Sequence, residues 1–225
     1  MNYTTTPYRI FPLGDSAITI DFGNRISSDF NTEVMERFGQ LKQEPLPGTI
    51  ELVPAYSSLT IYYDIPALKL KKIVNNHFTV YEWMKELLEE KLKIPVQEKI
   101  NDERRMTIPV CYEREFSPDI EQLAALKDIS VEEIVQIHTS IQYKVYMLGF
   151  LPGFAYMGEV DEKIAMPRKS QPQNVAAGSV GIAGKQTGIY PFASPGGWQI
   201  IGRTPLKLFN PDKEMPTLLQ SGDII

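Results

Sequence analysis

The sequence is poor in the residues that build disulfide frameworks and zinc centres. Among its 225 residues there are one cysteine, Cys111, and two histidines, His77 and His138. A single cysteine cannot form an internal disulfide, and these three residues lie too far apart to match the ligand spacing of a structural zinc site. We therefore expect no internal disulfide and no metal centre, which is compatible with a reducing compartment.

Positive charge and long apolar runs are also scarce. The formal net charge is −5 and there is no basic stripe, so the sequence does not predict a nucleic-acid-binding surface. No apolar run reaches the ~18 residues of a membrane-spanning helix. The first residues, MNYTTTPYRIF, lack the charged segment and apolar run of a signal peptide. These absences predict a cytoplasmic protein.

Residues 1–96 have the pattern of a small α+β domain. Alternating apolar residues predict four strands, and apolar residues at helical spacing predict a helix after each pair of strands. The second helix is expected to follow Pro66 as one long helix with a buried stripe from Leu70 to Leu88, on which His77 is a core or rim residue. This order favours helices on one face of an antiparallel sheet. The predicted strands are Tyr8–Leu13, Ala17–Asp21, Thr49–Val53 and Ser58–Tyr63.

The second half of the chain is mostly β in pattern. The polar and charged residues 97–105 are the expected linker to a domain at 106–225. A strand is expected from Met106 to Cys111, followed by two short helices. Ten of the 15 glycines then fall between Gly149 and Gly202. Short strands between turns predict a β-barrel or sandwich.

Two glycine-rich motifs resemble catalytic loops, and neither fits. In GIAGKQTG, Gly181–Gly188, Ser179 stands where a phosphate loop requires its first glycine, and Gln186 stands where it requires Ser or Thr. In AGSVG, the serine follows its glycine directly, unlike the G-x-S-x-G elbow of hydrolases. We expect a β-turn that carries polar side chains instead.

Polar donors nevertheless lie along the glycine- and proline-rich backbone. Donors held on turns can bind a carbonyl, carboxylate or phosphate oxygen. His138 ends a capped helix, where a cation would also be favoured by the helix dipole, and Trp198 also fits a core position. We assign no catalytic residue. The candidate groove-binding residues are Arg168, Lys185, Gln186, Tyr190, Arg203 and His138.

The segment GFLPGFAYMGE, Gly149–Glu159, carries large apolar residues on an irregular backbone. Pro152 has no amide hydrogen, so the segment must leave the strand after Phe150 and run over the surface. We predict that at least one of Phe150, Phe154 and Tyr156 is exposed beside a groove and binds a partner protein. The alternative is that all three rings plug the open end of a barrel.

Several long motifs in fixed order resemble the KipI family, whose members are also called the B subunit of 5-oxoprolinase or allophanate hydrolase subunit 1. The resemblance covers nearly the whole chain. It implies a ferredoxin-like domain at 1–96 and a cyclophilin-like β-barrel at 106–225. The motifs are PLGDSAITIDFG, PAYSSLTIYYD, YMLGFLPGFAYMGEV, MPRKSQP, AGSVGIAGKQTGIYP and SPGGWQIIGRTPLKLF.

The resemblance also implies work in a complex. With a C subunit of the KipA type and a barrel-type A subunit, such a protein belongs to an ATP-dependent 5-oxoprolinase, which opens the 5-oxoproline lactam to glutamate. ATP is expected for the complex, with no cofactor bound by this chain alone. One alternative is a protein-binding inhibitor of a sensor histidine kinase. Another is a purely structural scaffold protein.

The sequence departs from the family pattern in two places. In QPQNVAAGS, Gln173 stands where the family has Arg and Ala176 where it has Pro, so a loop expected to line the groove is altered. The sequence ends at SGDII, where the family usually continues into one more strand. The last strand of the second domain is then expected to be truncated.

Overall fold

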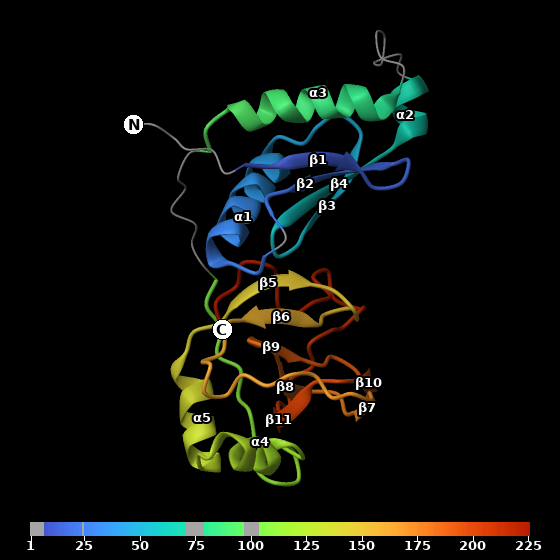
Figure 1. Ribbon diagram of the computed structural model, residues 1–225. Helices are drawn as coiled ribbons and strands as arrows, with labels where there is room; N and C mark the ends of the chain where they lie inside the picture. The colour runs from blue at the N-terminus through green and yellow to red at the C-terminus, as the bar shows by residue number, and fades with distance from the viewer. Residues whose placement is uncertain (1–6, 24, 71–78, 97–103) are drawn as a thin grey trace. The chain divides into compact units, whose positions relative to one another are not determined.

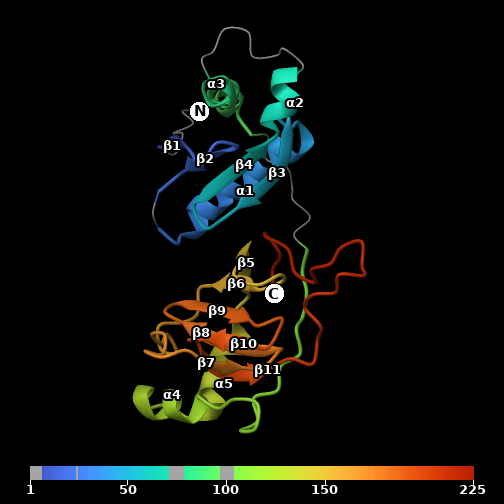
Figure 2. The same ribbon diagram turned by 90° about the vertical axis from the view of Figure 1, so that its right-hand side faces the viewer.

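The chain divides into two compact units in the computed structural model, Met1–Asn101 and Asp102–Ile225 (Figures 1 and 2). The structure describes residues 7–23, 25–70, 79–96 and 104–225. The first unit is α+β and the second is mostly β, which confirms the fold class predicted for each half. Most of the predicted linker, residues 97–103, lies outside the described residues.

The first unit contains a four-stranded antiparallel sheet in the order β1-β2-β4-β3. Ile18 and Ile20 of β2 are fully buried, as their alternation predicts. They belong to one apolar cluster with side chains from two helices of this unit, at Ser28–Gln43 and Val80–Lys93. The four strands lie where the sequence places them. They are β1 (Arg9–Pro12), β2 (Ala17–Asp21), β3 (Thr49–Pro54) and β4 (Ser58–Tyr63), and the helix between the two pairs is α1 (Ser28–Gln43).

The single long helix predicted after Pro66 is wrong. The structure has a short helix, α2 (Ile65–Leu70), and a separate helix, α3 (Val80–Lys93). Thr79 and Glu82 form a reciprocal capping box that starts α3, and the sequence T-x-x-E was the signal for this boundary. The buried stripe of α3 contains Met84 and Leu88, as predicted. His77 lies outside the described residues.

The second unit is built on a five-stranded antiparallel sheet in the order β11-β8-β9-β6-β5, with a separate two-stranded sheet of β7 and β10. One face of the large sheet packs against α4 and α5. The strands are β5 (Lys144–Leu148), β6 (Ala155–Gly158), β7 (Gln173–Val175), β8 (Ser179–Ala183), β9 (Gln186–Ile189), β10 (Ser194–Gly196) and β11 (Gln199–Arg203), and the helices are α4 (Ile120–Lys127) and α5 (Val131–Ser140).

Both edges of the large sheet pair with segments outside the named strands. Ile224 forms bridges with Lys144 of β5 and with Arg105, and Cys111 forms one with Arg203 of β11. The strand predicted from Met106 to Cys111 is therefore wrong as a continuous element, because between these bridges the backbone is irregular. These bridges link the two sheet edges through residues 105–111 and the end of the chain.

No helix in the described parts of the chain is both long and apolar enough to cross a membrane. The same parts of the chain contain no group of three or more His, Cys, Asp or Glu side chains placed to hold a metal ion.

Candidate functional site

Five aromatic residues, here called the aromatic cluster, lie on the face of the large sheet away from α4 and α5: Phe150, Phe154, Tyr156, Tyr190 and Trp198. The centre of the Phe154 ring lies 4.7 Å from that of Tyr156, 5.0 Å from that of Tyr190 and 5.4 Å from that of Trp198. Phe150 meets the Phe154 ring edge-on at 5.7 Å. Tilted and edge-on contacts of this kind stabilise a cluster beyond the area that they bury.

The register of the sheet makes room for the aromatic cluster. In the pairing of β6 with β9, Tyr156 lies opposite Gly188 and Met157 lies opposite Thr187. Directly opposite residues share a face, and successive residues of a strand point to opposite faces. A Cβ at Gly188 would lie 3.0 Å from atoms of the Phe154 and Trp198 rings. Glycine at this position therefore lets the rings pack directly on the sheet.

The turn between β5 and β6 separates an exposed ring from a buried one. Phe150 has a left-handed backbone, with φ of 68°, and its side chain is 61% exposed. A bulky residue with positive φ is unusual, and such backbone strain is concentrated at functional sites. Phe154 is 1% exposed. The prediction that it binds a partner directly is therefore wrong, because its ring is part of the core, whereas Phe150 is accessible.

Arg168 is the predicted site residue that the structure leaves accessible beside the aromatic cluster. Its guanidinium carbon lies 5.9 Å from the centre of the Trp198 ring, a distance at which a cation is attracted by the ring face. In the described parts of the chain, no carboxylate forms an ion pair with it. Burial raises the pKa of Tyr156, and the charge of Arg168 opposes that rise. The arrangement offers one uncompensated cation beside aromatic rings, which fits a small anion with an apolar body.

The other predicted donors have partners or lie within the core. Lys185 forms an ion pair with Glu162 at the turn between β8 and β9. Arg203 Nε donates to the carbonyl oxygen of Ala177 at 2.8 Å. Gln186 is partly buried on β9. Tyr190 is 1% exposed, so its predicted role in an open groove is wrong.

His138 lies on the opposite face of the sheet from Arg168. Its Nε2 is 3.0 Å from Thr187 Oγ1 and its Nδ1 is 2.8 Å from the Tyr112 hydroxyl. Burial lowers the pKa of His138 to about 4, so the ring is neutral near pH 7. The expected roles of His138 as a groove residue and as a helix-terminal cation are therefore both wrong. It joins α5 to β9 within the core.

The buried histidine makes a prediction for acid stability. The pKa of this histidine is 6.5 in the unfolded chain and about 4 in the folded chain. Between these two pH values the unfolded chain binds a proton that the folded chain does not, so the free energy of unfolding decreases as the pH falls from 6.5 to about 4. The loss amounts to roughly 3 kcal/mol at pH 4. His138→Gln cannot titrate. Denaturant unfolding from pH 7 to pH 4 should show the stability advantage of the original chain shrinking by about this amount, and a constant advantage would contradict the assignment.

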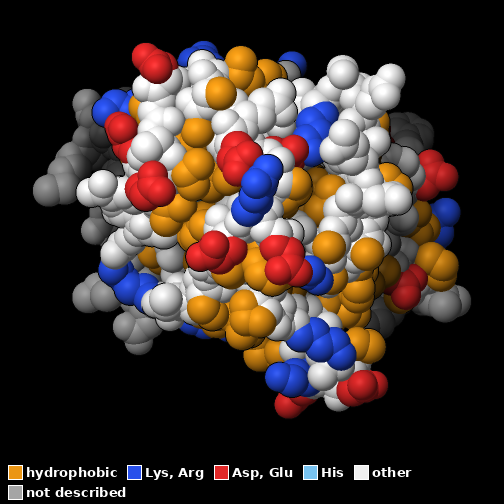
Figure 3. Space-filling view, turned by 90° about the horizontal axis from the view of Figure 1, so that it is seen from below, with side chains coloured by type: hydrophobic (Ala, Val, Ile, Leu, Met, Phe, Trp, Pro, Cys, Tyr) orange, Lys and Arg blue, Asp and Glu red, His pale blue; other side chains and the backbone are white. Residues whose placement is uncertain are grey.

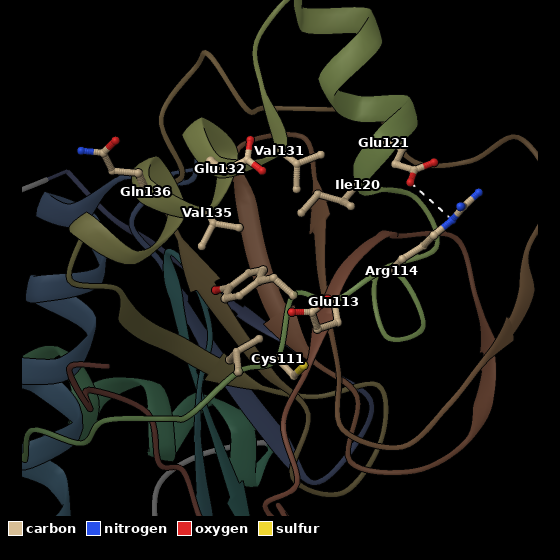
Figure 4. Close-up of a pocket in the computed structure, with 11 residues that line it drawn as sticks. Cys111, Glu113, Arg114, Ile120, Glu121, Val131, Glu132, Val135 and Gln136 are labelled. Atoms are coloured by element: carbon tan, nitrogen blue, oxygen red, sulfur yellow. Dashed lines mark ion pairs between the residues drawn. The ribbon is translucent and has the colours of Figure 1, made fainter.

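A hollow of about 650 Å³ lies between α4, α5 and residues 110–114 (Figure 4). Ile120, Val131 and Val135 point into it, and Arg114 faces Glu121 at one rim, where the ion pair measures 3.4 Å. In Figure 3, which shows the molecule from below, hydrophobic side chains are interspersed with acidic and basic ones. None of the predicted site residues lines this hollow, so it is distinct from the aromatic cluster.

Comparison with known proteins gives consistent matches over most of the chain. Residues 8–219 match the family model described as carboxyltransferase domain, subdomain C and D. The chain is 46% identical to the B subunit of 5-oxoprolinase from Bacillus subtilis, over 98% of this chain and 92% of that protein. It is 34% identical to the B subunit of 5-oxoprolinase from Escherichia coli O157:H7, over 96% and 94%. In the crystal structure of TTHA0988, 92% of this chain superposes with a TM-score of 0.77 and 32% identity, and it spans 38% of that longer chain.

Proposed function

Because the chain belongs to the family of carboxyltransferase domains, subdomains C and D, we propose that it is the B subunit of a 5-oxoprolinase. The observation that carries this proposal is the 46% identity to the B subunit of a 5-oxoprolinase over 98% of the chain. Identity at this level over both units supports a shared role for the whole chain. The two units would then be a ferredoxin-like domain and a cyclophilin-like barrel, with the bridges at the sheet edges completing the barrel wall.

The chain is expected to work with partner proteins, the A and C subunits of the enzyme. The TTHA0988 chain continues well beyond the part that this chain matches, which is consistent with a function that needs further domains. The turn at Gly184 and Lys185 does not fit a phosphate loop, because it connects two hairpin strands and its lysine is paired with Glu162. We therefore assign the ATP site of the complex to a partner.

Arg168 is the residue that we assign to the substrate. At neutral pH, 5-oxoproline carries a carboxylate on a small apolar ring. A guanidinium can bind a carboxylate through two parallel hydrogen bonds, and the aromatic cluster supplies apolar surface beside Arg168. This chain would thus hold and orient the substrate, while exposed Phe150 contacts the partner protein. Inhibition of a histidine kinase stays a prediction from the sequence.

The purified chain alone is expected to form no glutamate from 5-oxoproline, even with ATP present. The reason is that its glycine-rich turn cannot hold a nucleotide and that its histidine in the second unit is buried in a core network. A coupled assay for glutamate measures this directly, with a reaction containing added glutamate as the detection control. Glutamate production by the single chain would refute its role as a non-autonomous component of the enzyme.

A further inference from the structure

Asp119 stands immediately before α4, yet its carboxylate does not cap the helix. Its Oδ2 instead accepts a hydrogen bond from the Ile200 backbone at 2.6 Å and forms an ion pair with Lys169 Nζ, also at 2.6 Å. The two charged side chains are only 11% and 14% exposed. Charges withdrawn from water need compensating partners. The pair therefore links the start of α4, strand β11 and the loop before β7.

The loop that carries Arg168 is also tied to the segment that carries Trp198. The Lys169 N–H donates to the Gly197 carbonyl at 2.7 Å. The Gln199 side chain donates to the Pro167 carbonyl at 2.9 Å. Residues 167–169 therefore run beside residues 197–199, so that the Arg168 guanidinium lies over the Trp198 ring.

Gln173 completes the surroundings of Lys169. Lys169 Nζ donates to Gln173 Oε1 at 2.8 Å, so the ammonium has one charged and one neutral acceptor. An arginine at position 173 would place a second cation next to Lys169, whose one carboxylate partner, Asp119, is already engaged. The neutral residue at 173 therefore fits the ion pair that is present in this chain.

From this geometry we propose that Asp119 and Lys169 are positioning residues whose ion pair fixes Arg168 over Trp198, in the place where its guanidinium meets the substrate carboxylate. The identity of that carboxylate rests on the proposed function. The positioning of Arg168 is a property of this chain alone and can be measured without substrate. The sequence gives no signal for this pair, because the two residues are separated by 50 positions and nothing in the motif that contains Lys169 points to Asp119.

Trp198 fluorescence reports the position of Arg168. In a Trp83→Phe background Trp198 is the only tryptophan, and Arg168→Met gives its emission without the cation over the ring. Asp119→Asn keeps an oxygen for the Ile200 N–H but removes the charge that holds Lys169. We expect it to shift the emission in the same direction as Arg168→Met. In the double variant Arg168→Met/Asp119→Asn, no further shift is expected, because the cation is already absent.

Two further variants serve as a repeat and a control. Lys169→Met should reproduce the shift, because it breaks the same pair. Glu121 lies two positions from Asp119 and forms an exposed ion pair with Arg114. Glu121→Gln breaks that pair and should leave the emission unchanged. An Asp119→Asn shift that is equally large with and without Arg168 would overturn the proposal, because the pair would then act on Trp198 directly. No shift at all would overturn it as well.

Turnover separates this inference from the proposed function. In the assembled complex, Asp119→Asn is expected to raise the KM for 5-oxoproline about 3- to 10-fold and to change kcat less than about twofold, as for a weakened ground-state contact. If the emission shifts as expected but neither Asp119→Asn nor Arg168→Met changes KM, Arg168 is positioned by the pair but is not the carboxylate ligand. That result would contradict the assignment of Arg168 to the substrate carboxylate and leave the positioning intact, whereas a complex that forms no glutamate with the unchanged chain would contradict the proposed function itself.

Discussion

Replacing Phe154 with alanine is expected to lower the free energy of unfolding of the second unit by about 3–5 kcal/mol. The side chain is 1% exposed and contacts four other rings of the aromatic cluster. Its loss removes buried apolar surface and leaves a cavity that the sheet beneath cannot fill. Denaturant unfolding of the purified chain, followed by the emission of Trp198 in a Trp83→Phe background, measures the change.

Phe150→Ala is the matched control for this loss. The ring is 61% exposed, so its removal should change the free energy of unfolding by less than about 0.5 kcal/mol. It should instead weaken binding of the partner protein by about 1–3 kcal/mol, as removal of interface aromatics often does. Equal destabilisation by the two alanine variants would show that Phe150 belongs to the core. Unchanged partner affinity would remove it from the interface.

Arg168→Met is expected to raise the KM for 5-oxoproline by roughly 10- to 100-fold in the assembled complex. The variant keeps the length and apolar contacts of the side chain over Trp198 but removes the charge that would pair with the substrate carboxylate. Lys207→Met, which removes an exposed cation of the same unit, is the matched control and should leave KM unchanged. The measurement is the initial rate of glutamate formation over a range of 5-oxoproline concentrations.

An equal rise of KM in both variants would point to loss of general positive charge rather than of a specific ligand. A fall in kcat with unchanged KM would place Arg168 in the transition state rather than in substrate binding. Each result would overturn the assignment of Arg168 as the carboxylate ligand.

The sequence was sufficient to predict the class of both units, because local patterns determine strands and helices. Ile18 and Ile20 alternate with Thr19, and the glycines of the second half allow only short strands. The boundary at Thr79 was predictable in principle, since T-x-x-E is a capping signal. It was missed because the apolar spacing continues across it.

The composition of the site was less predictable, because it depends on register and on distant pairs. His138 and Arg168 are both polar residues near the glycine-rich segment, and only the fold separates them, because His138 bonds to Thr187 of β9 whereas Arg168 lies over Trp198. In the sequence, Lys185 and Arg168 are equal candidates for binding an anion, because both are cations in the same region. Only the fold shows that Lys185 is paired with Glu162. Asp119 is brought to the site by its contacts with Ile200 and Lys169, both of which are distant from it in the sequence.

An omission experiment with the three components of the proposed 5-oxoprolinase tests the subunit assignment directly. The A and C subunits are incubated with ATP and 5-oxoproline, with and without this chain, and glutamate is measured as a function of time. Glutamate is expected only when all three proteins are present, at a rate that rises with added chain until the chain is stoichiometric with its partners. Equal rates with and without the chain would contradict its assignment as the B subunit.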